Sequence, residues 1–178
     1  AGKEDCREAA VLARALGNAE LGAQAALAYG GVFVFGVVDP VLVQMLEESL
    51  ETLPPGDSAL RARLMARLAA ALQPSPTSSE PVAIAREAIA IARRLGDERA
   101  LLDTLYAALA ALMDIVDWTE SRALNLEVER LALAAQDRER LLRTNLRLVV
   151  CHLGLGELEA GDARLAAFEA MAVELRAP

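Results

Sequence analysis

The sole histidine, His152, stands beside Cys151 in the apolar segment LVVCHLGL, which makes this dipeptide the first place to look for nucleophilic chemistry. A thiol that is activated by an imidazole requires the two side chains to converge. Adjacent positions of an α-helix point about 100° apart, so these two side chains diverge. Two cysteines and one histidine without ligand spacing do not complete a tetrahedral zinc shell. We interpret His152 as a core or helix-end residue, and we expect no catalytic, metal or cofactor site.

Three further motifs have a structural interpretation. Gly154 and Gly156 form a G-x-G pattern, but no strand precedes it, so we predict a tight turn rather than a dinucleotide site. Glu47 and Glu48 are adjacent and diverge, which favours a solvated face over an acid/base pair. Trp118 begins a predicted helix, and we expect it to pack against the preceding helix rather than to bind a ligand.

Composition limits the class of protein. The chain has 178 residues and a formal net charge of −8, whereas binding to a nucleic-acid backbone requires clustered positive charge. We therefore expect no direct nucleic-acid partner. Cys6 and Cys151 are far apart in sequence, and we interpret them as buried free thiols of a cytoplasmic protein. We expect one domain over residues 1–178. Because the sequence begins with Ala1 and not with Met, we also expect it to be a piece of a longer chain.

The segment AYGGVFVFGVVDP, residues 28–40, differs from its surroundings because it is rich in β-branched residues and glycine. Extended back to Ala23, the segment gives sixteen uncharged residues before Asp39, 23–38, whereas a membrane span needs about 20 apolar residues. Glycines and the Asp39–Pro40 pair also interrupt it, so we expect no membrane segment. We predict an interhelix connection, followed by a helix with Asp39 as N-cap. Phe33 and Phe35 are then candidate apolar contacts for a neighbouring module or a second copy.

Four turn signals recur with a period of about forty residues. Asn18, Asp57, Asp97 and Asp137 are spaced 39, 40 and 40 residues apart, and each is typical of a helix end followed by the next N-cap. Each repeat therefore holds two helices, and such pairs stack into an all-α, α-α superhelix because one pair alone cannot bury its apolar face. We predict nine antiparallel helices, at residues 4–16, 19–29, 40–53, 58–72, 80–95, 98–113, 118–135, 138–153 and 157–175.

The apolar pattern repeats in phase with the turns. Ile84, Ala88, Ile91 and Leu95 follow the spacing of one helix face, and the residues forty positions later are apolar as well. The third copy places Arg164 at the position that matches Ile84. The final helix should also expose part of its apolar face, namely Val173, Met171 or Phe168.

Two resemblances follow from these segments. The segment LVVCHLGLGELEAGDARLAAFEAMA resembles the end of the first helix, the Gly turn and the second helix of a tetratricopeptide (TPR) repeat. The unit is longer than a TPR, and the consensus Trp and Tyr are missing. The segments GVVDPVLVQMLEESLETLPPGDSALRARLMARLAAAL and AREAIAIARRLGDERALLDTLYAAL resemble the TPR-like region of large bacterial signal-transduction ATPases. These are the MalT-like and large LuxR-type transcriptional regulators and related cyclase- or kinase-linked proteins, and the resemblance extends over nearly the whole chain.

The second resemblance implies a nucleotide-binding module upstream of a helical sensor or scaffold, and often a DNA-binding output module downstream. This chain lacks a GxxxxGKS/T phosphate loop and a helix-turn-helix output motif. The expected function is a non-catalytic scaffold that binds a protein, a peptide or a small effector. One alternative is a self-association module that forms a homodimer. The alternative from the enzyme class is a small helical enzyme, which no group of residues in the sequence supports.

In TPR-like stacks the first helix of each pair lines the inner groove. Positions six residues after each turn signal are Gln24, Arg63, Asp103 and Arg143, and Tyr106 lies one turn after Asp103 on the same predicted face. We predict that this row lines a groove for a peptide or small effector. The alternative is a set of surface ion pairs, each worth about 0–1 kcal/mol.

Overall fold

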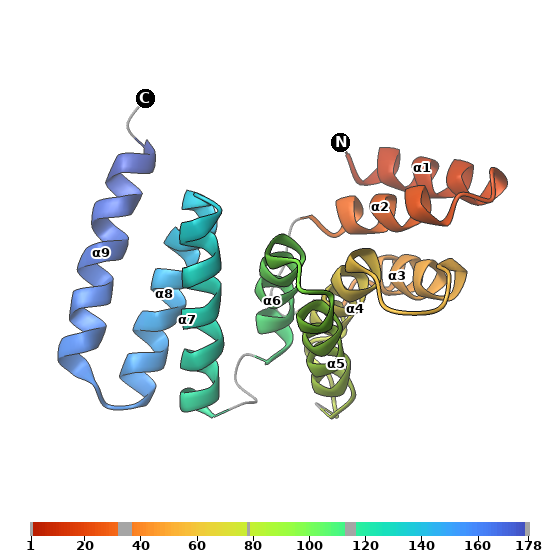
Figure 1. The fold of residues 1–178 in the computed structure, drawn as a ribbon. Helices are drawn as coiled ribbons and strands as arrows, with labels where there is room; N and C mark the ends of the chain where they lie inside the picture. Colours follow the sequence, from red (N-terminus) through yellow and green to blue (C-terminus); the bar gives the residue numbers. More distant parts are fainter. Residues whose placement is uncertain (1, 32–36, 78, 113–116, 177–178) are drawn as a thin grey trace. The chain divides into compact units, whose positions relative to one another are not determined.

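The structure is a computed structural model that describes residues 2–31, 37–77, 79–112 and 117–176 (Figure 1). All regular secondary structure within these residues is α-helical, which confirms the predicted all-α class. Every helix agrees with its predicted range to within one residue at either end. The helices of the described residues are α1 Lys3–Ala15, α2 Ala19–Tyr29, α3 Pro40–Thr52, α4 Ala59–Ala71, α5 Ser79–Leu95, α6 Glu98–Leu112, α7 Trp118–Ala134, α8 Arg138–Gly154 and α9 Leu158–Arg176.

The helices begin where the turn signals predict. The side chains of Asn18, Asp97 and Asp137 accept hydrogen bonds from backbone N–H groups of the first turns of α2, α6 and α8. Such a bond satisfies one of the four free N–H groups at a helix start. At the second signal the cap is Ser58, the residue after Asp57. The forty-residue period is therefore a period of helix caps.

The residue before each turn signal has left-handed backbone. Gly17, Gly56 and Gly96 have φ values of 63°, 107° and 69°, and Gln136 has φ 55°. A left-handed residue after a helix lets the following N–H groups reach the last carbonyls. The Asp137 N–H, for example, donates to the carbonyl of Ala132 at 2.9 Å. Glycine adopts this conformation without strain, whereas glutamine does not.

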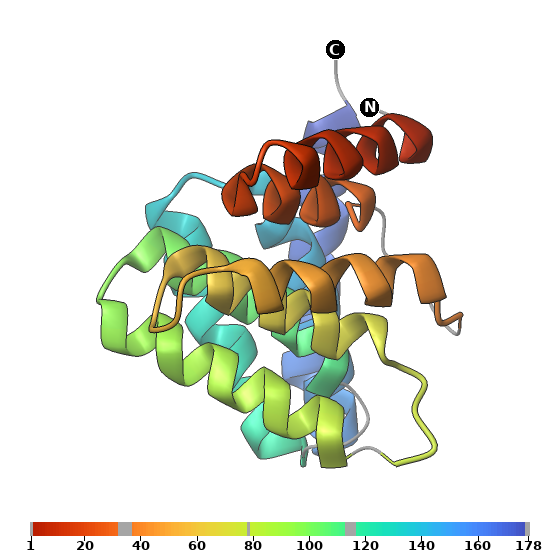
Figure 2. The ribbon, with the colours of Figure 1, turned by 90° about the vertical axis from the view of Figure 1, so that its right-hand side faces the viewer.

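The chain divides into two compact units, Ala1–Ala111 (unit 1) and Leu112–Pro178 (unit 2). In unit 1, α1 packs on α2, α2 on α3, α3 on α4 and α4 on α5 (Figure 2). Helices α1 to α4 share one hydrophobic core, whose buried members include Cys6, Tyr29, Leu46 and Leu64. The predicted single domain and superhelix stay predictions.

Unit 2 contains α7, α8 and α9, with α8 in contact with both others. Its core combines apolar residues such as Val128 and Leu148 with buried polar ones. Arg164 of α9, the charged residue on the predicted apolar face, forms an ion pair with Glu129 of α7. It also donates to Asn145 Oδ1 at 3.2 Å. A half-buried polar contact thus replaces the apolar one that the repeat predicts at this position.

The segment at residues 28–40 is described only in part. Asp39 accepts from the N–H groups of Val41 and Leu42, and Pro40 opens α3, as predicted. Phe33 and Phe35 lie outside the described residues. Among the described helices, none has both the length and the apolar character of a membrane span.

The last helix exposes apolar side chains, as predicted. Val173 is 72% exposed, and Phe168 and Met171 are half-buried. Cys6 and Cys151 are both buried free thiols, which confirms that part of the prediction.

Candidate functional site

A cluster of three polar side chains in unit 2 lies at the turn between α8 and α9. His152 lies in the last turn of α8, and its Nδ1 is 2.7 Å from Oε2 of Glu157, the residue before α9. Arg122 of α7 donates to both oxygens of the same carboxylate, at 2.7 and 2.8 Å. The hydrogen bond from His152 and then that from Arg122 lower the pKa of Glu157. This cluster ties one end of α7, α8 and α9 together.

Cys151 does not share this cluster. Its Sγ lies 3.3 Å from Oγ of Ser121, and the residue is only 2% exposed. Within the described residues, Glu157 is the hydrogen-bond partner of the His152 ring. The thiol and the imidazole therefore point to different partners, as their adjacent helix positions predict. No group of three or more His, Cys, Asp or Glu side chains in the described part of the chain is placed to hold a metal ion.

Two residues of the predicted groove row meet in unit 1. Nε of Arg63 on α4 is 3.6 Å from Oδ2 of Asp103 on α6, and Arg99 approaches the other oxygen at the same distance. Both arginine side chains are largely exposed, whereas that of Asp103 is 13% exposed. Because ion pairs at the surface contribute little to stability, this contact fits the alternative of structural ion pairs as well as a groove.

The other members of the row are described by their own positions. Gln24 is exposed on α2, and Tyr106 is half-buried on α6. Arg143 is exposed on α8 of unit 2, where it forms an ion pair with Glu139 at 2.8 Å. A row that runs through all five residues stays a prediction.

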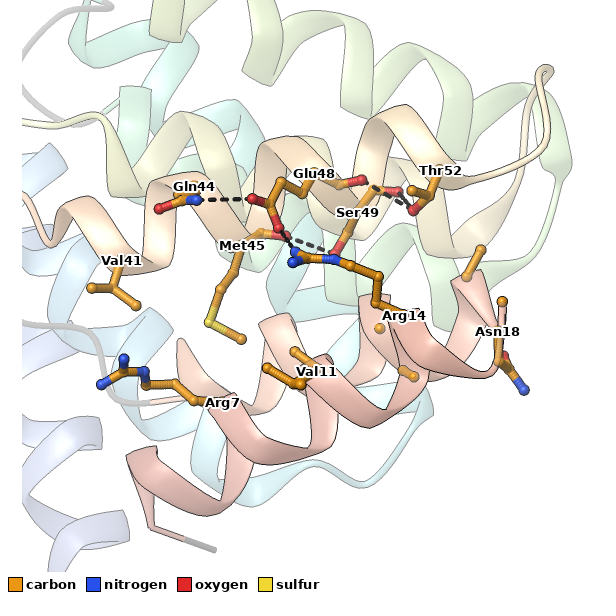
Figure 3. A pocket seen from close by; sticks show the side chains of 15 residues that line it. Arg7, Val11, Arg14, Asn18, Val41, Gln44, Met45, Glu48, Ser49 and Thr52 are labelled. Carbon is orange, nitrogen blue, oxygen red and sulfur yellow. Dashed lines mark hydrogen bonds and ion pairs between the residues drawn. The ribbon is translucent and has the colours of Figure 1, made fainter.

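A groove of about 350 Å³ lies between α1 and α3, with the start of α2 at one end (Figure 3). Its walls come from second-type helices, that is, helices that end rather than begin at a turn signal. It is lined by Arg7, Ala10, Val11, Ala13, Arg14, Gly17, Asn18, Ala19, Gly22, Val41, Gln44, Met45, Glu48, Ser49 and Thr52.

The groove has apolar walls and charged edges. Val11, which is 63% exposed, faces the groove from α1, and Val41 and Met45 face it from α3. Arg14 reaches across the groove to form an ion pair with Glu48 (Figure 3). The other oxygen of Glu48 accepts a hydrogen bond from Gln44 Nε2 at 2.8 Å.

Several polar atoms of the groove are satisfied by their own helices. The hydroxyl of Ser49 donates to the carbonyl of Met45 at 2.7 Å, and that of Thr52 donates to the carbonyl of Glu48 at 3.0 Å. Asn18 Oδ1 accepts the N–H of Leu21 at 3.0 Å. The groove also holds the guanidinium groups of Arg7 and Arg14, which are paired with Glu4 and Glu48. The Asn18 NH2 group is a further donor, and Gln44 Oε1 is an acceptor.

The sequence prediction missed this groove because it placed binding on the first helix of each pair. One signal was present: Arg7, Val11 and Arg14 follow i, i+4, i+7 spacing and so share one stripe of a helix. An apolar side chain between two cations on one stripe is typical of a contact surface. The pattern marks a surface but does not show that α3 faces it.

The structure places the remaining sequence motifs. Gly156 has φ 75° and forms the predicted turn. Glu47 is exposed, whereas Glu48 turns toward the groove. The indole of Trp118 packs over Gly154 of α8, which follows Trp118 in the chain. The missing Cβ of Gly154 admits the ring. Packing against the preceding helix stays a prediction.

No protein-family model matches the chain, and none of the curated proteins is significantly similar to it in sequence.

Proposed function

We propose that the chain is a non-catalytic helical-repeat scaffold that binds a peptide segment of a partner protein, with the α1–α3 groove as its binding site. The observation that carries the proposal is the open apolar stretch at Val11, flanked by the guanidinium groups of Arg7 and Arg14. Exposed apolar side chains with a charged border are typical of protein-interaction surfaces.

The shape of the groove favours a peptide over a small effector. Its volume is at the lower end of the range for small-molecule pockets, about 300–1,000 Å³, which bury most of their ligand. Val11 and the Arg14 side chain are largely exposed, so the groove leaves one side of a small guest in solvent. A chain segment that continues along α1 would contact more of this surface.

The chemistry of unit 2 also supports a non-catalytic role. An activated nucleophile needs a base within hydrogen-bond distance, but Cys151 is buried against Ser121 while His152 contacts Glu157. We place the scaffold in the cytoplasm, in keeping with its two free thiols. We further propose, from the resemblance of its repeats, that it serves a bacterial regulator of the MalT-like or large LuxR-type class. A parent chain without a phosphate-loop motif would contradict this assignment.

Selection of a random displayed peptide library against the whole chain tests the binding function. We expect enriched peptides with dissociation constants of about 1–100 μM, a range suited to a transient contact of this size. Val11→Asp should weaken them at least tenfold. The matched control is Leu133→Asp on α7, because Leu133 is similarly exposed, at 59%, but lies in unit 2.

Light scattering on the same sample separates this function from self-association. A peptide-binding scaffold keeps its mass when the protein concentration rises. A stable dimer that buries Val11, or a folded chain that enriches no peptide, would contradict the proposal.

A further inference from the structure

The structure assigns a chemical class to the guest of the α1–α3 groove: we infer that it is an acidic amphipathic helix of a partner protein. The guest's carboxylates would contact Arg7 and Arg14, and its apolar side chains would lie on Val11 and Met45. This inference rests on the proposed peptide-binding function and adds the charge and the spacing of the peptide.

The charge of the guest follows from the polar groups that line the groove. Ser49 and Thr52 donate to their own helix, and Asn18 Oδ1 is occupied by a backbone N–H. Glu48, the one acidic lining residue, already has Arg14 and Gln44 as partners. Beside the Gln44 Oε1 acceptor, the groove offers the exposed guanidinium groups of Arg7 and Arg14, for which a carboxylate is the matching partner.

When Arg14 changes partners, the Glu48 carboxylate loses its ion pair but keeps a hydrogen bond. Gln44 Nε2 holds Oε1 of Glu48 at 2.8 Å, so Glu48 retains a hydrogen bond when Arg14 turns to a guest. The Arg14 side chain is 66% exposed, which leaves room for this turn. Among the described residues, Arg7 is held by Glu4, one turn away on the same helix at 3.4 Å, and such exposed pairs are weak.

The spacing of the two arginines sets the pattern of the guest. They are seven residues apart on α1, a rise of about 10 Å along the helix. Val11 lies between them on the same stripe. A helix that lies alongside α1 matches this stripe when two acidic residues seven positions apart flank one or two large apolar residues.

A labelled synthetic helix tests the inference by fluorescence anisotropy with the whole chain. The probe is an alanine-based peptide of about 15 residues, long enough to form a helix, with two Glu seven positions apart and two Leu between them. The comparison peptides have the same sequence with Gln or with Lys in place of both Glu residues. We expect the Glu peptide to bind at least tenfold more tightly than the Lys peptide, and the difference to shrink at high salt.

Variants locate the peptide on the groove. Arg7→Glu and Arg14→Glu should each weaken the Glu peptide about three- to thirtyfold, since each turns one exposed attraction into repulsion. The chain with both changes should prefer the Lys peptide. Arg7→Glu leaves the Arg14–Glu48 pair intact, so it tests the idea even if Arg14→Glu disturbs α3. The matched control is Arg138→Glu, which alters an exposed ion-paired arginine of unit 2 outside the predicted groove row and should leave binding unchanged.

The outcomes separate this inference from the function on which it rests. If library peptides bind but Glu, Gln and Lys probes bind alike, the scaffold function holds and the acidic guest is wrong. If Arg138→Glu weakens binding as much as Arg7→Glu, the site lies on α8 and the α1–α3 groove is wrong. If neither library peptides nor probes bind the folded chain, both proposals fail.

Discussion

The contact between Trp118 and Gly154 allows a prediction in which one substitution changes sign with its background. A Cβ added at Gly154 would lie 2.7 Å from Cγ of the Trp118 ring, and closer still to the shared ring-bond atoms Cδ2 and Cε2. Ordinary carbon contacts to a Cβ begin at 3.4 Å. Gly154→Ala must therefore push the indole away from α8.

Two effects of opposite sign set the size of the change. Alanine is favoured over glycine in a helix by about 0.5–1 kcal/mol. Overpacking of a filled site costs about 1–3 kcal/mol. Trp118 is 37% exposed and can tilt outward, so the overpacking cost extends into the lower part of that range. We expect Gly154→Ala to lower the free energy of unfolding of unit 2 by about 1–2 kcal/mol.

Removal of the ring should reverse the sign. In a Trp118→Ala background the added Cβ meets no indole, so Gly154→Ala should stabilise unit 2 by about 0.5–1 kcal/mol. The coupling energy of the double-mutant cycle is then about 1.5–3 kcal/mol.

Urea unfolding of all four proteins, followed by circular dichroism, measures these free energies. Trp118 is the only tryptophan of the chain, so its fluorescence reports ring displacement directly in the single Gly154→Ala variant. Additive effects in the cycle, or stabilisation by Gly154→Ala while Trp118 is present, would refute the packing argument.

Three further predictions concern single residues and are checked by urea unfolding. Gln136→Gly should stabilise the chain by about 1 kcal/mol, because Gln136 has φ 55° and glycine adopts this conformation without strain; no change would contradict the strain. Arg164→Met should cost about 1–3 kcal/mol because it leaves half-buried Glu129 unpaired, whereas Arg138→Met, at an exposed ion pair, should cost less than about 1 kcal/mol. Because the pKa of Glu157 is lowered in the folded state, its contribution is present above about pH 4.3 and is lost as the pH falls through the lowered pKa. Glu157→Gln should therefore reduce the acid-induced loss of stability, and an unchanged profile between pH 3 and 6 would contradict this.

Helix positions could be predicted from the sequence because their determinants are local. Asn18, Asp97 and Asp137 cap helices through side chains two or three residues from the bonded N–H groups. The preceding left-handed residue ends the earlier helix through hydrogen bonds between residues only three to five positions apart. Gln136 lacks the flexibility of glycine, but it stands in phase with Gly17, Gly56 and Gly96 and adopts the same left-handed backbone.

Side-chain partners across helices could not be predicted in the same way. Arg164 looked like a departure from an apolar face until Glu129 and Asn145 were found beside it. These partners are 35 and 19 residues away in sequence, and no periodicity identifies them. The division into two units is another feature that a regular forty-residue period conceals.

The groove between α1 and α3 has the same kind of origin. Periodicity distinguishes apolar from polar positions, but the depth of a groove depends on the size of each side chain. Here the lining includes Ala10, Ala13, Gly17 and Gly22, which bring little side-chain volume into the space between the helices. A Cβ at Gly22 would only touch that of Ala13, at 3.9 Å. Small residues thus leave space where larger ones would have closed it, while Arg7 and Arg14 give its border positive charge. A repeat with the same period and larger residues at these positions would have the same fold without this candidate binding site.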